Sequence, residues 1–182
     1  YQHAYKLQSI SVDKLTHLCI AFANPDSTGY LSTEGVNILP IVRRAQQDSV
    51  QVLISLAGGA QRPEWKAAWN RLLLPWNRRI FIQRIVNYVK AYNLDGVDLD
   101  LEWKSINQHY SAFVIELGQA LHDRGKLFTA ALPGIHRYPQ LSGRALQSFD
   151  FINLMAYDLT GHWAPNQPGP HAPYSFALRS LK

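Results

Sequence analysis

Three acidic residues alternate with apolar residues in the middle of the chain. In the segment from residue 94 to residue 103 (LDGVDLDLEW), single residues separate Asp98, Asp100 and Glu102. Side chains point alternately to opposite faces of a β-strand, so these three carboxyl groups would share one face, about 6–7 Å apart. Neighbouring carboxylates repel, and at least one should therefore keep a proton near neutral pH. Such a group can protonate a leaving-group oxygen, so the row predicts general acid catalysis.

A solvated sheet face and a divalent metal site are the alternatives to catalysis. Parallel sheets seldom leave a face open to water, and isolated carboxylates are rarely buried. A metal site would need ligands from other strands, whose ends carry few further acids. The sequence also has no His-Glu-x-x-His motif and no Cys/His cluster. The row is therefore interpreted as catalytic, and neither a metal nor a cofactor is expected.

Short apolar segments alternate along the chain with segments of helical periodicity. Five strands are predicted, over residues 15–23, 50–56, 96–101, 127–132 and 151–156. Helices are predicted over residues 33–47, 63–92 with a break at Pro75, 107–123, and again from about Ser175. The Pro-, Gly- and His-rich segment 161–173 predicts a long loop. Strands separated by helices, without hairpin signals, indicate a parallel sheet covered by helices.

Two architectures fit this alternation, an open doubly wound sheet and a closed (β/α)8 barrel. A dinucleotide-binding sheet should show a Gly-x-Gly-x-x-Gly turn after its first strand, and the sequence has none. In a barrel, Glu102 would lie at the carboxyl end of its strand, where barrel active sites open. Asp98 would lie deepest.

Composition and charge exclude several classes of protein. Hydrophobic residues make up 47% of the 182 residues and charged residues 17%, which is typical of one globular domain over residues 1–182. The longest apolar run, residues 52–60, is about half of what a membrane span needs. The net charge of +5 comes from scattered basic pairs without a nucleic-acid-binding motif, so no nucleic-acid partner is expected. Cys19, the single cysteine, is expected to be a small buried side chain.

The acidic row and two further motifs resemble one family of enzymes. Asp-x-x-Asp-x-Asp-x-Glu, from Asp95 to Glu102, resembles the signature on the fourth barrel strand of family 18 chitinases. Ser-Leu-Ala-Gly-Gly at residues 55–59 is similar to the Ser-x-Gly-Gly end of the third strand, with one residue extra or with Ala57 in place of the first Gly. Met-Ala-Tyr-Asp at residues 155–158 is similar to the Met-x-Tyr-Asp end of the sixth strand. Residues 16–23 resemble the second strand, so the resemblance covers nearly the whole chain.

The resemblance implies an α/β fold of the (β/α)8 TIM-barrel type that is incomplete here. The five predicted strands correspond to about the second to the sixth strand of the barrel, and a complete barrel takes about 250 residues. An open parallel sheet would expose two edges. Two explanations are open: the remaining strands belong to a longer chain, or another chain supplies them by association.

The resemblance also implies a mechanism. Family 18 enzymes are retaining glycosidases in which the 2-acetamido oxygen of the substrate acts as the nucleophile. Glu102 would protonate the glycosidic oxygen and then act as a base toward water. Asp100 would orient the acetamide, and Asp98 would hold the shared proton. Tyr157 would donate its hydroxyl to the acetamide oxygen.

Four further residues are expected at the site. Ser55 would hydrogen-bond to the acidic row, and Asp158 would contact the substrate or the acid. Met155 belongs to the same motif as Tyr157, and the alternative for both is simple core filling. Trp103 is either a platform on which a sugar stacks or a residue that packs against a helix.

The implied activity is hydrolysis of β-1,4-linked N-acetylglucosamine polymers, with chitin or an N-acetylglucosamine oligosaccharide as the partner. An endo-β-N-acetylglucosaminidase acting on N-glycans or peptidoglycan is the near alternative; Asp158, where those enzymes often have Asn, favours chitin. A chitin-binding lectin on the same fold is the other alternative, although such lectins typically lose the acid that Glu102 represents. The resemblance implies a secreted or periplasmic location, and no signal peptide is visible at the start of the sequence.

Overall fold

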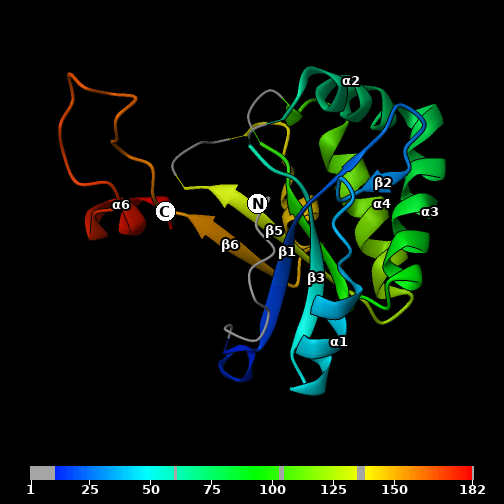
Figure 1. The fold of residues 1–182 in the computed structure, drawn as a ribbon. Helices are drawn as coiled ribbons and strands as arrows, with labels where there is room; N and C mark the ends of the chain where they lie inside the picture. Colours follow the sequence, from blue (N-terminus) through cyan, green and yellow to red (C-terminus); the bar gives the residue numbers. More distant parts are fainter. Residues whose placement is uncertain (1–10, 60, 103–104, 135–137, 182) are drawn as a thin grey trace.

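The computed structural model describes residues 11–181 apart from residues 60, 103–104 and 135–137. Its centre is a six-stranded sheet in the order β2-β1-β3-β4-β5-β6 (Figure 1). The strands are β1 (His17–Pro25), β2 (Leu31–Ser32), β3 (Gln51–Ala57), β4 (Gly96–Asp100), β5 (Leu127–Pro133) and β6 (Phe151–Met155). All except β2 run parallel to their neighbours.

Four of the described helices cover one face of this sheet. The helices are the 3-10 helix η2 (Val12–Lys14) and the α-helices α1 (Leu39–Gln47), α2 (Pro63–Leu72), α3 (Pro75–Ala91), α4 (Tyr110–His122), α5 (Gly143–Leu146) and α6 (Tyr174–Ser180). Helices α1 to α4 lie on the same side of the strands, whereas α6 and the loop before it extend to the other side (Figure 1). Among the described residues, no helix is long and apolar enough to cross a membrane.

The five predicted strands are confirmed, each within two residues of an observed strand. The predicted break at Pro75 is also confirmed, because α2 ends at Leu72 and Pro75 begins α3. The predicted parallel sheet is confirmed for β1 and β3 to β6. The α/β class that the sequence predicts is therefore correct.

The prediction of a helix from residue 33 is wrong, because the chain first makes a hairpin there. The carboxylate of Asp26 accepts hydrogen bonds from three successive backbone N–H groups, which folds the chain back into β2 antiparallel to β1. Glu34 and Gly35 then have φ angles of 54° and 83°, which a right-handed helix does not allow. Helix α1 begins only at Leu39, with Pro40 in its first turn.

The sheet is curved like the wall of a barrel. The rings of His17, at the start of β1, and Phe151, at the start of β6, approach to 5.2 Å between centroids although three strands separate them in the sheet. Their side chains therefore meet across the concave face. This curvature agrees with the barrel that the resemblance implied and turns the acidic row of β4 toward the same concave face.

The core lies on the convex face, between the strands and α1 to α4. Alternate residues of the central strands, among them Ile54, Leu56, Val97 and Leu99, are fully buried there. Three aromatic side chains join the helices: Phe81 of α3 and Phe113 of α4 stack with centroids 5.8 Å apart, and Trp69 of α2 meets both rings edge-on. This packing fixes which side of each strand faces the helices, and hence which side carries the polar row.

Cys19 corrects a prediction about burial. The sequence predicts a small buried side chain, but Cys19 is exposed. Cys19 pairs with Leu53, and Ala21, two residues later on the same face of β1, pairs with Ser55 of the polar site. Cys19 therefore lies on the concave face of the sheet, which the helices do not cover. Partial burial of the thiol and the charge of Asp98 still raise its pKa to about 12, so it is not a reactive nucleophile.

A buried asparagine connects the core to the end of β3. Asn24 accepts a hydrogen bond from Trp69 Nε1 at 3.1 Å and donates one to the carbonyl of Ala57 at 2.9 Å. Both bonds are buried, so neither partner can turn to water instead. Asn24 therefore holds α2, β1 and the last residue of β3 together.

Replacing Asn24 by alanine should leave the indole N–H and the Ala57 carbonyl without partners. We expect the free energy of unfolding to fall by roughly 2–4 kcal/mol in urea denaturation. Asn77→Ala, which removes an exposed hydrogen bond to the carbonyl of Arg71, is the matched control and should cost less than about 1 kcal/mol. A loss in Asn24→Ala no larger than in the control would show that the bridge is not structural.

Candidate active site

Strand register brings three polar side chains to one level of the concave face. Ser55 of β3, Asp98 of β4 and Thr129 of β5 are partners across the sheet. Ser55 Oγ donates to Asp98 Oδ2 at 2.7 Å, and Thr129 Oγ1 donates to Asp98 Oδ1 at 2.6 Å. All three side chains are buried. Each oxygen of Asp98 thus accepts a hydrogen bond from a different neighbouring strand, which fixes the orientation of its carboxyl group.

Asp100 lies one step closer to the carboxyl end of β4 and has a different environment. It is 8% exposed, and its Oδ1 has no hydrogen-bond partner among the residues that the structure describes. Burial raises its pKa from 3.8 to about 7, with further contributions from the negative charges of Glu102 and Asp98 and from a side-chain hydrogen bond to Glu102. Asp100 therefore carries a proton near neutral pH. The resemblance implied that Asp98 would hold the shared proton, whereas the hydroxyls that donate to both oxygens of Asp98 favour a proton on Asp100.

Glu102 follows the end of β4 and is half-buried. Its carboxyl group lies against Gly59, where an added Cβ would be only 2.7 Å from Oε1. The absence of a side chain at Gly59 therefore makes room for the carboxyl group. Glu102 is the outermost member of the row and the one best placed to meet a substrate at the mouth of the barrel.

The turn that carries Gly59 is built from two residues with left-handed backbone. Ala57 has a φ of 82° and Gly58 a φ of 84°, and the N–H of Gly58 donates to the carbonyl of Asp100 at 2.9 Å. That bond ties the end of β3 to the end of β4. A φ of 82° is a conformation that glycine favours, and Ala57 adopts it with a side chain present.

The Met-Ala-Tyr-Asp motif lies at the carboxyl end of β6. Tyr157 is 49% exposed and so does not fill the core. Partial burial and the negative charges of Asp100, Asp158 and Glu102 raise the pKa of Tyr157. The phenol of Tyr157 therefore lies close enough to the acidic row to interact with it electrostatically. Asp158, with a φ of 60°, lies 3.2 Å from Nε2 of His171. Met155, at the end of β6, is half-buried. Trp103, another expected site residue, lies outside the described residues.

Three residues near the site were not identified from the sequence. Thr129 gives no signal within an apolar strand and becomes visible only through register. Phe22 is 38% exposed, and its ring lies where a Cβ on Gly58 would be, so it forms an apolar wall beside the turn. Trp163, in the loop after β6, is exposed and meets the rings of His162 and His171 edge-on. The Pro-, Gly- and His-rich composition concealed these aromatic contacts.

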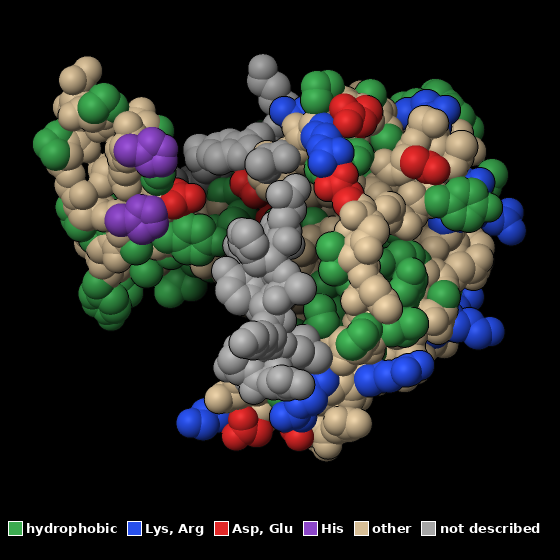
Figure 2. Space-filling model, viewed as in Figure 1, with side chains coloured by type: hydrophobic (Ala, Val, Ile, Leu, Met, Phe, Trp, Pro, Cys, Tyr) green, Lys and Arg blue, Asp and Glu red, His purple; other side chains and the backbone are tan. Residues whose placement is uncertain are grey.

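The surface around the site carries no concentrated basic patch on the face shown in Figure 2. Lys and Arg side chains are scattered along the margins of the main body, and histidines gather on the separate lobe formed by the chain after β6. Among the described residues, no group of three or more His, Cys, Asp and Glu side chains could hold a metal ion.

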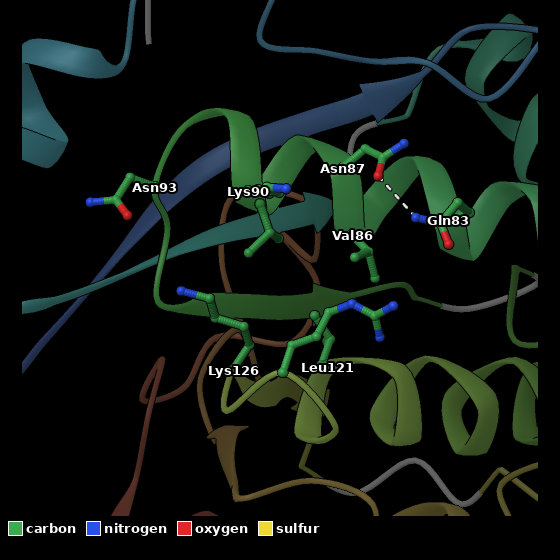
Figure 3. A pocket seen from close by; sticks show the side chains of 9 residues that line it. Gln83, Val86, Asn87, Lys90, Asn93, Leu121 and Lys126 are labelled. Atoms are coloured by element: carbon green, nitrogen blue, oxygen red, sulfur yellow. Dashed lines mark hydrogen bonds between the residues drawn. The ribbon is translucent and has the colours of Figure 1, made fainter.

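A groove of about 420 Å³ lies between α3 and α4, far from the acidic row (Figure 3). It is lined by residues at the carboxyl ends of the two helices and before β4 and β5, that is, at the opposite end of the strands. Its cations Lys90, Arg124 and Lys126 have a structural role available: Lys90 lies in the last turn of α3, and Arg124 donates to the carbonyl of Ala120. The groove therefore takes no part in the chemistry of the row.

Comparison with known proteins agrees with this geometry. The family model described as "Glycosyl hydrolases family 18" matches residues 1–180. The crystal structure of the GH18 chitinase ChiB from the chitin utilization locus of Flavobacterium johnsoniae is 46% identical with a TM-score of 0.93, and the match covers 97% of this chain and 58% of that one. The TIM-barrel type of fold is thereby confirmed, and the barrel is incomplete in these residues.

Two curated relatives match at lower identity. A chitinase-like effector of Moniliophthora roreri is 28% identical over 191 residues, which cover 93% of this chain and 45% of the relative. An endochitinase of Manduca sexta is 28% identical over 196 residues, which cover 88% of this chain and 33% of the relative. The chain thus spans less than half the length of each.

Because the pKa of Asp100 is raised in the folded protein, ionisation of this carboxyl group destabilises the fold. The pKa of the Asp100 carboxyl is about 7 in the folded protein and 3.8, the ordinary value, in the unfolded chain. Its proton therefore stabilises the fold fully below pH 3.8, and this stabilisation is lost as the pH rises to about 7. Asp100→Asn removes the charge and should be more stable than the wild type at pH 8, by roughly 3–4 kcal/mol, with little difference near pH 4.

Urea denaturation of both proteins at the two pH values measures this difference. Asp13→Asn, which replaces an exposed carboxylate outside the sheet, is the control and should not reproduce the gain. Equal stability of Asp100→Asn and the wild type at pH 8 would contradict a protonated, buried Asp100.

Proposed function

The chain belongs to glycosyl hydrolase family 18, and from that membership we propose that it hydrolyses β-1,4-linked N-acetylglucosamine polymers such as chitin, with Glu102 as the general acid and base. At the level of the family, membership supports chitin hydrolysis. The observation that carries the finer proposal is the hydrogen-bonded pair of Asp100 and Glu102, which holds a proton near neutral pH at the outer end of the row. We also propose that residues 1–182 form part of one catalytic barrel.

In the first step, Glu102 gives its proton to the glycosidic oxygen. The bond from the anomeric carbon to that oxygen breaks, and the leaving sugar departs as an alcohol. The 2-acetamido oxygen of the substrate forms a new bond to the anomeric carbon, giving a positively charged oxazolinium ion. The proton on Asp100 lies on the hydrogen bond to Glu102, which supports a supply of protonated Glu102 near neutral pH.

In the second step, Glu102 accepts a proton from water as the water attacks the anomeric carbon and opens the oxazolinium ring. Two successive inversions retain the configuration. Asp100 supports both steps, because its Oδ1 lacks a partner among the described residues and is suited to accept the acetamide N–H. The fixed carboxylate of Asp98 adds negative charge behind it, which favours the cationic intermediate.

The remaining site residues fit substrate contacts. Tyr157 keeps its proton through the working pH range because its pKa is raised, so its hydroxyl is suited to donate to the acetamide oxygen. Phe22 offers an apolar wall for a sugar face beside the Ala57–Gly59 turn. Asp158 is oriented by His171 and would meet a sugar hydroxyl. Ser55 supports Asp98 through its hydrogen bond, and Met155 and Trp103 remain expected substrate contacts.

A chitin-binding lectin without turnover is the second candidate. The observation that favours it is the match to a relative named a chitinase-like effector, a name that does not state hydrolysis. The intact pair of Asp100 and Glu102 favours the hydrolase, because binding alone does not need a proton donor. An endo-β-N-acetylglucosaminidase acting on N-glycans or peptidoglycan is the alternative within enzymes. For either polymer we propose a secreted or periplasmic location, where such large substrates are met.

Glu102→Gln should abolish release of product from a chromogenic N,N′-diacetylchitobiose glycoside while binding of chitin oligosaccharides persists. The substitution keeps the shape of the side chain and removes only the transferable proton, so the loss should be at least about 100-fold in kcat. Turnover is measured on the whole protein, and binding by calorimetry with tetra-N-acetylchitotetraose.

Turnover that survives in Glu102→Gln would sink the assignment of the acid. Tight oligosaccharide binding by a wild-type protein that never turns over would favour the lectin. Cleavage of N-glycans or peptidoglycan without cleavage of chitin oligosaccharides would favour the endo-β-N-acetylglucosaminidase.

Gly59→Ala tests the position of the acid rather than its presence. The new methyl group would meet Glu102 Oε1, the far end of a flexible side chain, so the carboxyl group should move while the fold remains intact. A displacement of this size should lower kcat/KM by about 100-fold with little change in the unfolding midpoint. Gly143→Ala, where an added Cβ meets nothing within 4 Å, is the control. Wild-type kcat/KM in Gly59→Ala would contradict the proposed place of Glu102.

A further inference from the structure

Thr129 is a buried hydroxyl in an otherwise apolar strand. β5 has the sequence LFTAALP, and Thr129 is fully shielded from solvent. A buried hydroxyl is unfavourable unless it has a hydrogen-bond partner, and the side-chain partner of Thr129 is Asp98 Oδ1 at 2.6 Å. Valine has nearly the same shape and would pack there without that requirement. Packing alone therefore does not account for threonine at this position.

The two donors to Asp98 come from opposite sides. Ser55 reaches Oδ2 from β3 and Thr129 reaches Oδ1 from β5, and both residues are the register partners of Asp98 in the neighbouring strands. Because each oxygen is held separately, the carboxyl group cannot rotate without breaking a bond. Hydrogen bonds from neutral donors to a carboxylate are also stronger than those to a neutral acid. The pair therefore fixes both the orientation and the charge of Asp98.

The titratable groups around Asp98 do not supply that stabilisation. Asp100 follows it toward the mouth on the same strand, Cys19 interacts with it from β1, and Tyr110 interacts with it from α4. β3 and β5 contribute only the two hydroxyls at this level. Aspartate, cysteine and tyrosine are neutral when protonated and negative when ionised. None of the titratable groups named here can therefore offset a negative charge on Asp98.

We infer that Thr129 is a positioning residue for the proposed hydrolysis: with Ser55 it clamps Asp98 as a carboxylate, so that the mobile proton of the row stays on Asp100 and Glu102 at the mouth. The inference rests on the proposed function. Without the clamp, the proton would be shared with Asp98, one step deeper and away from the glycosidic oxygen.

Thr129→Val removes the hydroxyl and keeps the shape, and Thr129→Ser keeps the hydroxyl. In the whole protein, Thr129→Val should lower kcat/KM about tenfold at pH 6. It should also move the pH–rate profile to higher pH by about one unit, because the negative charge of the row loses one hydrogen-bond donor. Thr129→Ser should restore the wild-type profile. Thr33→Val, which removes a hydroxyl that donates to the carbonyl of Val36 outside the row, is the matched control. Unfolding midpoints establish that each variant is folded.

A second measurement does not depend on turnover. Carboxyl-carbon NMR of aspartate-labelled protein should show the titration near pH 7 on Asp100 in the wild type, with part of its amplitude transferred to Asp98 in Thr129→Val but not in Thr129→Ser. A wild-type protein without turnover would overturn the proposed function and leave this readout to decide the clamp. An unchanged pH profile and unchanged amplitudes in Thr129→Val, or equal losses in the Val and Ser variants, would overturn the inference itself.

Discussion

Repulsion among carboxyl groups on one strand is the constraint on which the rest of the structure depends. Asp98, Asp100 and Glu102 share a face of β4, where water is partly excluded and like charges at this spacing cannot all persist. The three groups meet the constraint in three ways. Asp98 is held as a carboxylate by two hydroxyls, Asp100 is protonated near neutral pH, and Glu102 lies half-buried at the mouth. The three carboxyl groups therefore have three different environments on one strand.

The scaffold supplies these surroundings through register and through a few buried contacts. The aromatic cluster of Trp69, Phe81 and Phe113 holds the helices against the convex face, so the polar side of β4 must face inward. Asn24 then ties that cluster to the last residue of β3, and the turn after it brings Gly59 against Glu102. A chain of contacts therefore runs from the core between the helices to Glu102.

Much of this could be predicted from the sequence, and the remainder could not for physical reasons. Alternation of apolar and acidic residues predicts both the strand and the shared face of Asp98, Asp100 and Glu102. Register between strands is not written in local sequence, which is why Thr129 was missed. The false helix start at residue 33 has a similar cause: Glu34 and Gly35, just after the hairpin, have φ angles of 54° and 83°, and the periodicity of apolar residues does not reveal this. Cys19 was misjudged because an apolar run does not reveal which of its faces the helices cover.

The protonation of Asp100 also has an evolutionary consequence. In the proposed hydrolase, a carboxyl group with a pKa of about 7 in a buried row is tolerated only while selection acts on turnover. Without that selection, substitutions that neutralise the acidic row increase folding stability. Neutralising substitutions should then accumulate, and reversions should not. Descendants that only bind sugar would arise readily from a hydrolase of this kind, whereas the reverse path would have to accept a less stable protein before any turnover rewarded it.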